Sequence, residues 1–467
     1  MPLLTRPLNY SPHPEDLFAC LRHLPWPMLL DSGKPHGKYG RYDILVAQPC
    51  ITLRSFENQD GEFHTEICEA GNCLVVAGDP FVLLRDVLAR YPLRFDESVP
   101  FAGGALGYWG YDLVRALEVL PNISIANLNL PQMLIGIYDW AVVIDHQQKT
   151  TNLVSHGLFE STRRDWKTLC TLLTSALPAQ NTSFEVRTPI AFQMSEARYR
   201  IAFETIQRHI RAGDCYQVNL AQRFSVQASG DGWLAYQKLR ALSGAPFMAY
   251  LNAAGIEVLC TSPERFLEVR GQRVQACPIK GTRPRAGEAT ADARLIKELS
   301  LSAKDHAENL MIVDLLRNDL GKTCAVGSVE VQVLCRLQSY SNVHHLVSVI
   351  SARLDESRSP VDLLRSAFPG GSITGAPKIA AMRIIEGLET HRRGVYCGAI
   401  GYIGFDGQMD SNIAIRTAVY MDGELSGYAG GGIVSDSDGA SEYCETLDKA
   451  SHLLAMMRYF YESYSKG

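Results

Sequence analysis

The chain has 467 residues, of which 46% are apolar and 20% are charged. This balance is typical of a globular chain and excludes global disorder or one long coiled coil. The 45 basic and 50 acidic residues give a formal net charge of −5. We therefore expect no nucleic-acid partner and favour small molecules or another protein as ligands.

No apolar run reaches the roughly 18 residues that a membrane span needs. The N-terminal segment 1–6 also lacks the charged and apolar regions of a secretory signal. We therefore expect a cytoplasmic chain without a membrane partner. The twelve cysteines are scattered singly and form no C-x-x-C pair, which predicts free thiols rather than a metal or redox motif.

The N-terminal part is predicted to mix strands and helices. Its expected elements are strands over 41–47 and 51–56, a helix begun by Asp79 and Pro80, a hairpin of 135–145 with 150–154, and a helix near 161–174. The polar segment 178–183 is the best linker candidate. It suggests an N-terminal region over 1–185 and a second region over 190–455.

The second region begins with a helix that is capped by Ser195 and stopped by Gly213. A strand over 215–220 and one long helix over roughly 291–318 follow. Two Asp-Gly turns, at Asp406 and Asp422, predict an antiparallel three-stranded meander over about 397–434. Such interspersed strands and helices with antiparallel connections indicate large α+β layers.

Two segments place acids three residues apart, so that both carboxylates of a pair lie on one helix face. They are Asp305 with Glu308 and Glu442 with Glu445. Carboxylates that converge from two helices suit a hard cation such as Mg²⁺. The alternative is an ordinary exposed ion pair, for example of Glu445 with Lys449 four residues on.

Three further features have both a chemical and a plain structural interpretation. Glycines around Gly431 allow the backbone to approach a ligand, or simply form a bulge. Arg416 lies in the apolar run 413–419, where it faces either a ligand cavity or an internal salt bridge. Lys280 is either a snorkelling side chain or, if buried with a lowered pKa, a nucleophile.

These segments occur in one order along the chain. The ordered motifs are Ser262-Pro263-Glu264-Arg265-Phe266, Pro278-Ile279-Lys280-Gly281-Thr282, the run 307–319, the run 343–348, the loop 368–378, the Arg416 strand, 429–434 and 442–449. This series resembles the chorismate-utilising enzymes over residues 190–455, and the N-terminal part resembles the N-terminal region of the same family. The resemblance implies a four-layer α/β/β/α sandwich to which both regions contribute.

The resemblance also implies the roles of particular residues. Glu308 and Glu445 would bind Mg²⁺ directly, and Asp305 and Glu442 would act through water. The ion would hold the ring carboxylate of chorismate. The other substrate-binding positions that it implies are Arg416, Tyr402, Gly431, Gly432, Thr374 and His345. Arg416 and Tyr402, with glycine amides near Gly431, would hold the pyruvyl carboxylate.

Two positions indicate the branch of the family. Gln217 stands where relatives that activate water carry a lysine, which favours ammonia as the nucleophile. Lys280 stands where anthranilate-forming relatives carry alanine, and it would attack C2 of chorismate as the 4-hydroxyl leaves. Glu264 would protonate that hydroxyl, which requires a raised pKa, and Lys280 would need a lowered one. The implied product is 4-amino-4-deoxychorismate, in para-aminobenzoate and folate biosynthesis.

The resemblance implies a partner as well. No glutaminase motif is present, so a separate glutaminase subunit would supply ammonia. The alternatives are an anthranilate-forming enzyme or a non-catalytic tryptophan-binding regulatory subunit. The segments 29–32 and 245–248, with Ser32, Pro246 and Phe247, resemble the two halves of the family's tryptophan pocket. Plain packing against Phe247 is the other interpretation of those segments.

Overall fold

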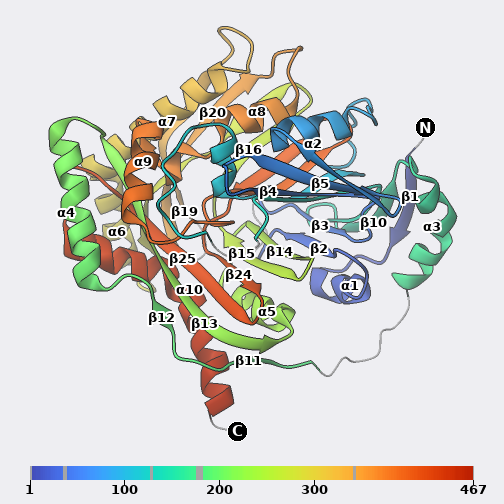
Figure 1. Cartoon of the computed structure of the whole chain (residues 1–467), viewed down its shortest axis with the longest axis horizontal. Coiled ribbons are helices and arrows are strands. Elements are labelled where there is room, and N and C mark those ends of the chain that lie inside the picture. Colours follow the sequence, from blue (N-terminus) through green and yellow to red (C-terminus); the bar gives the residue numbers. More distant parts are fainter. Residues whose placement is uncertain (1–2, 35–38, 127–129, 175–181, 340–342, 466–467) are drawn as a thin grey trace.

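A computed structural model describes residues 3–34, 39–126, 130–174, 182–339 and 343–465 of the chain. Two large sheets lie face to face, and neighbouring strands run antiparallel (Figure 1). Sheet A contains, in spatial order, β1 (Leu4–Leu8), β10 (Thr150–Ser155), β9 (Trp140–Asp145), β3 (Tyr42–Val46), β2 (Met28–Asp31), β14 (Phe247–Ala253), β15 (Ile256–Ser262), β24 (Thr417–Met421), β25 (Glu424–Ile433), β13 (Gln217–Gly230) and β11 (Phe184–Val186), while β12 (Ala191–Phe192) and β21 (Gly375–Ala376) also pair with β13.

Sheet B has a similar width. Its spatial order is β18 (Ile279–Pro284), β20 (Val343–Arg353), β17 (Arg273–Ala276), β16 (Arg265–Arg270), β23 (Met409–Ile413), β22 (Ala399–Gly404), β7 (Gly104–Trp109), β8 (Met133–Tyr138), β4 (Ile51–Glu57), β5 (Phe63–Glu69) and β6 (Asn72–Ala77), with β19 (Glu330–Ser339) paired to β20. Both sheets contain strands from both predicted regions, so the two regions share the same layers.

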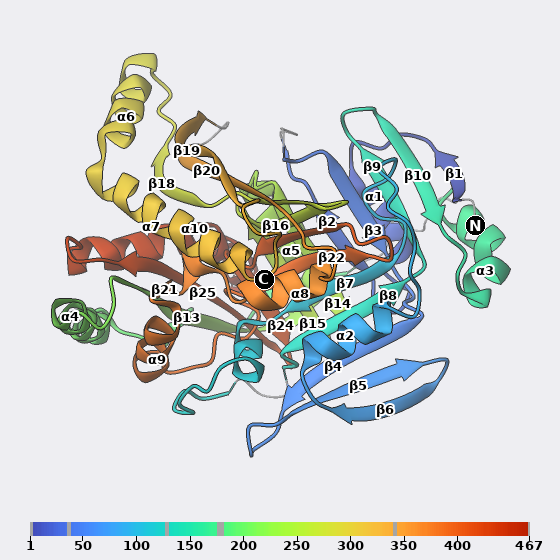
Figure 2. The same ribbon diagram turned by 90° about the horizontal axis from the view of Figure 1, so that it is seen from above.

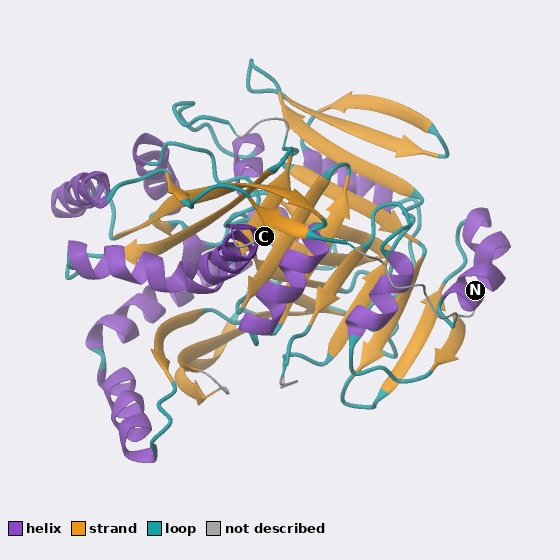
Figure 3. Cartoon of the chain, turned by 90° about the horizontal axis from the view of Figure 1, so that it is seen from below, coloured by secondary structure: helices purple, strands orange, loops and turns teal. Residues whose placement is uncertain are grey.

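Helices cover the outer faces of the two sheets (Figure 3). Against sheet A lie α1 (Pro14–Leu21), α3 (Glu160–Leu172), α5 (Gly232–Leu242) and α10 (Gly439–Ser465), and against sheet B lie α2 (Pro80–Leu88), α7 (Ala303–Gly321) and α8 (Pro360–Ala367). The remaining helices are α4 (Glu196–Ala212), α6 (Ala289–Leu301) and α9 (Lys378–Leu388), with the short turns η1 (Tyr111–Ala116) and η2 (Gly371–Ile373). The layers are therefore helix, sheet, sheet and helix, which confirms the predicted sandwich.

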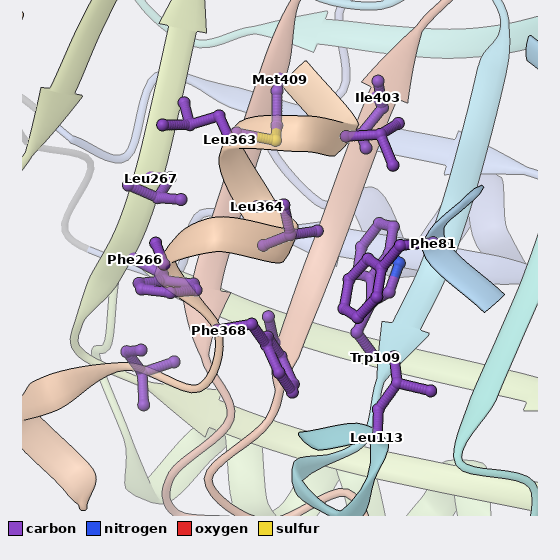
Figure 4. Close-up of a cluster of buried hydrophobic side chains, with 14 of the residues drawn as sticks. Phe81, Trp109, Leu113, Phe266, Leu267, Leu363, Leu364, Phe368, Ile403 and Met409 are labelled. Carbon is purple, nitrogen blue, oxygen red and sulfur yellow. The ribbon is translucent and has the colours of Figure 1, made fainter. Parts of the chain in front are cut away.

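Three apolar layers hold these elements together. Residues from the facing sides of both sheets, such as Tyr108 and Leu251, form the middle layer. The layer between sheet B and its helices is built on aromatic side chains, and Figure 4 shows Phe81, Trp109 and Phe368 gathered around the α8 residue Leu364. Because packed interiors tolerate few voids, these layers fix the position of α7 and α8 relative to the strands.

Several predicted boundaries are confirmed. Asp79 caps α2, since its side chain accepts a hydrogen bond from the Phe81 amide. Ser195 caps α4 in the same way, and Gly213 ends that helix in the left-handed conformation with φ of 82°. These signals depend only on local backbone chemistry, so tertiary packing does not change them.

Three predictions of continuous elements are wrong. The strand over 135–145 is two strands, β8 and β9, which belong to different sheets and meet at the buried Asp139. The meander over 397–434 is two hairpins, β22–β23 in sheet B and β24–β25 in sheet A. The long helix over 291–318 is α6 and α7, because the Ser302 hydroxyl accepts from the Asp305 amide and starts a new helix.

One cysteine prediction is also corrected. Cys68 and Cys73 lie opposite each other on β5 and β6 and form a disulfide, while ten other cysteines in the described chain are free thiols. The turn at Ala70 and Gly71 pairs the two positions across the hairpin. Sequence spacing alone did not reveal this pairing, since it depends on the strand register.

Leu364 tests the packing of the layer between sheet B and its helices. Its side chain is fully buried. Leu364→Ala is expected to lower the free energy of unfolding by about 2–5 kcal/mol, because it removes apolar contacts and leaves a cavity. Urea unfolding measures the change. The matched variant Leu74→Ala, at a side chain that is 69% exposed, should stay within about 0.5 kcal/mol of the parent. Equal losses in both variants would contradict this assignment.

Candidate active site

The acids and the lysine singled out in the sequence meet at one end of the sandwich. They come from α7, α10 and β18, which lie on the same side of the molecule in Figure 2. The Lys280 amine donates to Glu308 Oε1 at 2.8 Å and to the Ser372 carbonyl at 3.1 Å. Gln217 Nε2 on β13 donates to the same Glu308 oxygen at 2.7 Å. One carboxylate therefore joins three separate elements.

The local backbone explains why Lys280 points at this carboxylate. The pairing of β18 with β20 shifts register between Lys280 and Thr282, and Gly281 at this bulge has φ of 72°. A Cβ at Gly281 would also come within 3.0 Å of the Asp305 side chain. Only glycine fits both requirements without strain. The bulge thus sets the direction of the neighbouring lysine.

The charge state of Lys280 differs from the sequence prediction. Burial alone lowers the pKa of this amine, but the Glu308 carboxylate beside it, with Glu264 and Glu445, outweighs burial and raises that pKa. The prediction of a lowered pKa for Lys280 is therefore wrong for the protein without ligands. Lys280 is therefore an ammonium in the protein without ligands. The pKa of Glu308 is lowered, because the effect of Lys280 and the other donors outweighs the effect of burial, which raises that pKa.

The other acids each have a basic partner. Glu445 pairs with Lys449 at 2.6 Å, Glu442 with Lys304 at 3.1 Å, and Asp305 with Arg283 at 3.4 Å. The ion pair between Glu445 and Lys449 was the plain structural alternative, and it is present. No three carboxylate oxygens of this set lie within 4.8 Å of one another among the described residues.

Glycines on β25 make room for these acids. A Cβ on Gly431 would lie 3.2 Å from Glu442 Oε2 and 3.7 Å from Glu445 Oε1. A Cβ on Gly432 would lie 2.9 Å from Glu308 Oε1 and 2.0 Å from Gln217 Nε2. The two glycines therefore bring the backbone of one strand against three carboxylates. An all-oxygen donor set of this kind chemically fits a hard dication such as Mg²⁺.

Glu264 lies just beyond β15 and is only 7% exposed. Its Oε1 accepts from the Ser372 hydroxyl at 2.8 Å. Burial raises the pKa of this carboxyl, and the opposing effects of Lys280, the Ser372 hydroxyl and Lys449 do not cancel it. The direction agrees with the sequence prediction. Glu264 has the environment that a general acid requires.

Arg416 lies between the two sheets rather than in mid-strand. It connects β23 to β24 with φ of 51°. Burial lowers the pKa of its guanidinium, and no ion pair to it is found in the described part of the chain. The predicted alternative of an internal salt bridge is thus not seen there. Its charge also reaches His345, whose pKa falls to about 4, first through burial and then through Arg416.

The loop after α8 and the strand β20 supply one further neighbour each. Thr374 is buried, and its hydroxyl donates to the Gly370 carbonyl at 3.0 Å. Its own carbonyl accepts from the Asn219 amide of β13 at 2.9 Å. His345 Nδ1 lies 2.9 Å from the Thr282 hydroxyl of β18. Thr374 therefore directly follows the turn η2 that carries Ser372, and His345 lies on β20, which pairs with the Lys280 strand β18.

Tyr402 does not join this site. Its hydroxyl accepts a hydrogen bond from Arg270 at 2.9 Å, and its side chain lines a different cavity of about 560 Å³. The predicted pairing of Tyr402 with Arg416 is therefore wrong. Residues of β22 alternate between the two faces of sheet B. The sequence alone therefore did not predict which face, and hence which cavity, the Tyr402 side chain occupies.

Ser32, Pro246 and Phe247 line that same cavity. The segments 29–32 and 245–248 come together because β2 pairs with β14, with Asp31 opposite Met248. The Asp31 carboxylate accepts from the Tyr236 hydroxyl at 3.0 Å and from Arg240. The two predicted halves of the pocket thus form one cavity, and the Asp31 charge is compensated by Arg240 on α5.

Ser372 and Lys304 are the site residues that the sequence did not reveal. Ser372 contacts Glu264, which is 108 positions away, and Lys304 contacts Glu442, which is 138 away. Neither residue type nor local spacing marks such contacts. The only signal was the run of glycines around Ser372, which indicated a tight loop near the site.

Comparison with known proteins identifies the class. Residues 29–455 match the family described as chorismate binding enzyme, and the chain belongs to this family. It is 44% identical to aminodeoxychorismate synthase component 1 of Salmonella typhimurium over 94% of this chain and 95% of the relative, and 44% identical to the protein of that name from Escherichia coli over 95% and 96%.

A solved structure shows the same fold. Anthranilate synthase component I from Streptococcus pneumoniae matches with a TM-score of 0.77 and 32% identity, over 89% of this chain and 92% of that chain. Helices of the length and apolarity that a bilayer span requires are not found among the described residues.

Arg416 tests whether this site is built around an uncompensated cation. Arg416→Met is expected to raise the free energy of unfolding by about 1 kcal/mol, because it removes a largely desolvated charge that has no carboxylate partner. Thermal unfolding without ligands measures the change. The comparison variant Arg393→Met removes a buried cation that pairs with Glu389 at 2.6 Å and should destabilise the protein instead. A loss of stability in Arg416→Met would contradict the inferred free guanidinium.

Proposed function

We propose that this chain aminates chorismate at C4 and releases 4-amino-4-deoxychorismate, as a step of para-aminobenzoate and folate biosynthesis. The observation that carries the proposal is the position of the Lys280 amine, which donates to the Glu308 carboxylate and to the carbonyl of Ser372, whose hydroxyl binds Glu264. Relatives named aminodeoxychorismate synthase, at 44% identity over nearly the whole chain, support the same activity.

Lys280 and Glu264 divide the chemistry between them. The Lys280 nitrogen forms a bond to C2, the ring double bonds shift, and the C4–O bond breaks as Glu264 donates its proton to the leaving hydroxyl. Ammonia then bonds to C4, the double bonds shift back, and the C2–N bond breaks to free Lys280. The overall exchange consumes ammonia and releases water. Before it attacks, Lys280 must lose the proton that Glu308 stabilises.

Charged groups at two ends of the site suit a dianionic substrate. Glu308 and Glu445 would hold Mg²⁺ directly, and Asp305 and Glu442 would do so through water. When bound, the ion would neutralise and orient the ring carboxylate. Arg416, with backbone amides near Gly431 and Gly432, would hold the pyruvyl carboxylate, and Thr374 and His345 would line the site.

We expect a separate glutaminase subunit to supply the ammonia, and the name component 1 of the relatives supports a two-part enzyme. Ten free thiols among the described residues are typical of a reducing compartment such as the cytoplasm, and the Cys68–Cys73 disulfide is the exception to that pattern.

Product identity tests the proposal. The purified chain is incubated with chorismate, MgCl₂ and an ammonium salt, and the products are separated by chromatography with mass detection. We expect 4-amino-4-deoxychorismate with its pyruvyl group retained. Fluorescent anthranilate with release of pyruvate would instead show the alternative anthranilate-forming activity. No turnover of chorismate at high ammonia would favour a non-catalytic subunit.

Lys280 is the residue on which turnover depends most. Lys280→Ala is expected to reduce the rate of 4-amino-4-deoxychorismate formation by at least about 100-fold, because the covalent route is lost. Steady-state assays with an ammonium salt measure the rate. Lys167→Ala, at an exposed lysine of α3, is the matched control and should keep the parent rate. An unchanged rate in Lys280→Ala would contradict the assignment of Lys280 as the nucleophile.

The carboxylates provide a test for Mg²⁺. Calorimetric titration of the protein with MgCl₂ is expected to show one site that is lost in Glu445→Gln. Glu424→Gln, at a carboxylate that pairs with Arg223 outside the site, should bind the ion like the parent. Equal affinities in all three proteins would remove Glu445 from the set of ligands.

The cavity of about 560 Å³ beside the paired strands β2 and β14 is proposed to hold tryptophan, in contact with Ser32, Pro246 and Phe247. Its lining combines the aromatic Phe247 with the guanidinium of Arg265, which lies 5.0 Å from that ring. Mass spectrometry of the supernatant after acid denaturation should detect tryptophan in stoichiometric amount if the ligand is structural. A cavity that neither retains nor binds added tryptophan would contradict the assignment.

A further inference from the structure

Ser372 is in contact with both residues to which we assign the chemistry. It lies in the turn η2, is 8% exposed, and its hydroxyl donates to Glu264 Oε1 at 2.8 Å. Its carbonyl accepts from the Lys280 amine at 3.1 Å. One residue therefore links the proposed acid to the proposed nucleophile through two different groups.

The direction of this hydrogen bond limits where the Glu264 proton can be. A serine hydroxyl has a single proton, and an unprotonated carboxyl oxygen only accepts. With Ser372 donating to Oε1, the acidic proton belongs on Oε2. No hydrogen bond to Oε2 is found in the described part of the chain, so that oxygen is available to a bound substrate.

The loop that carries Ser372 is held rigidly. The buried Arg393 guanidinium donates to the Ile373 carbonyl at 2.9 Å and to the Asn219 carbonyl of β13 at 2.7 Å. On the other side, a Cβ at Gly371 would lie 2.3 Å from the Leu315 side chain of α7. The turn is thus fixed between β13 and α7, and the Ser372 hydroxyl is set in place before substrate binds.

We propose that Ser372 is a positioning residue that holds the Glu264 carboxyl by Oε1 and leaves its transferable proton on Oε2. The inference rests on the proposed function, since it assigns a role within the same reaction. It adds a residue that neither binds the metal nor forms a bond to the substrate. Its effect is to make one oxygen of Glu264 the acid.

The charges that face Glu264 predict a second effect of the same hydroxyl. Burial raises the pKa of Glu264, while Lys280 on β18, the Ser372 hydroxyl and Lys449 on α10 lower it. The Cys397 thiol is a further titratable neighbour, and burial raises its pKa to about 12, so it stays neutral. Removing the hydroxyl should therefore raise the pKa of Glu264 further. A reaction that needs protonated Glu264 loses rate as pH rises through that pKa.

Kinetic profiles of three variants test the proposal. Ser372→Ala, Ser372→Thr and Ser366→Ala are assayed against chorismate with Mg²⁺ at a constant concentration of free ammonia across the pH range. Ser366 lies on α8, where its hydroxyl donates to the Leu363 carbonyl, and it is the matched control. We expect Ser372→Ala to lower kcat by about 10- to 100-fold, with KM for chorismate changed less than about 2-fold.

The pH profile separates positioning from a general loss of structure. In Ser372→Ala the basic limb of kcat/KM should move to higher pH, while Ser372→Thr, which keeps a hydroxyl, should retain the parent limb and most of the rate. Ser366→Ala should match the parent in both. A Ser372→Ala enzyme with the parent rate, or with a reduced rate but an unmoved basic limb, would overturn the proposal.

An infrared measurement keeps this test independent of turnover. The C=O stretching band of a protonated carboxylic acid that disappears in Glu264→Gln reports protonation of Glu264 without substrate. Its titration midpoint should rise in Ser372→Ala relative to the parent and stay in place in Ser366→Ala. An unmoved midpoint would refute the positioning role. Failure of the parent protein to form aminated chorismate would refute the proposed function instead, whatever this midpoint shows.

Discussion

The ion pair between Lys280 and Glu308 is the contact on which the arrangement of the site depends. A buried carboxylate is costly unless a cation and hydrogen-bond donors compensate it, and Glu308 obtains both from Lys280 and Gln217. These donors come from β18 and β13, which belong to different sheets, and Glu308 comes from α7. Compensation of this single charge therefore holds three layers of the fold together where the acids gather.

The same requirement explains the neighbouring pairs. Glu442 and Glu445 on α10 take Lys304 and Lys449 as partners, so the acids are kept neutralised in the protein without ligands. Arg416 is the exception, because it lies where the chain passes from sheet B to sheet A and has no carboxylate beside it in the described part of the chain. A site with compensated anions at one end and an uncompensated cation nearby suits a substrate that brings two carboxylates of its own.

The sequence predicted the features that have a local cause. The predictions failed where packing between distant parts of the chain determines the structure. The caps at Asp79 and Ser195 depend on backbone amides within one turn, so they were predictable. The exchange of strands between sheets at Asp139 and near Arg416 depends on packing across the sandwich. Apolar residues continue on both sides of each break, so the sequence suggested a continuous strand. Tyr402 was placed at the wrong site for the same reason. The Lys280 charge state was mispredicted because Glu308 is distant in sequence.

The proposed covalent bond between Lys280 and the ring is tested most directly by mass spectrometry of the protein quenched during reaction with chorismate and Mg²⁺ without ammonia. We expect an adduct with the mass of chorismate less one water. Peptide mapping should locate it on the segment that contains Lys280, and it should disappear when ammonia is added before the quench. Amination at the full rate with no such adduct, or an adduct on another residue, would contradict the account.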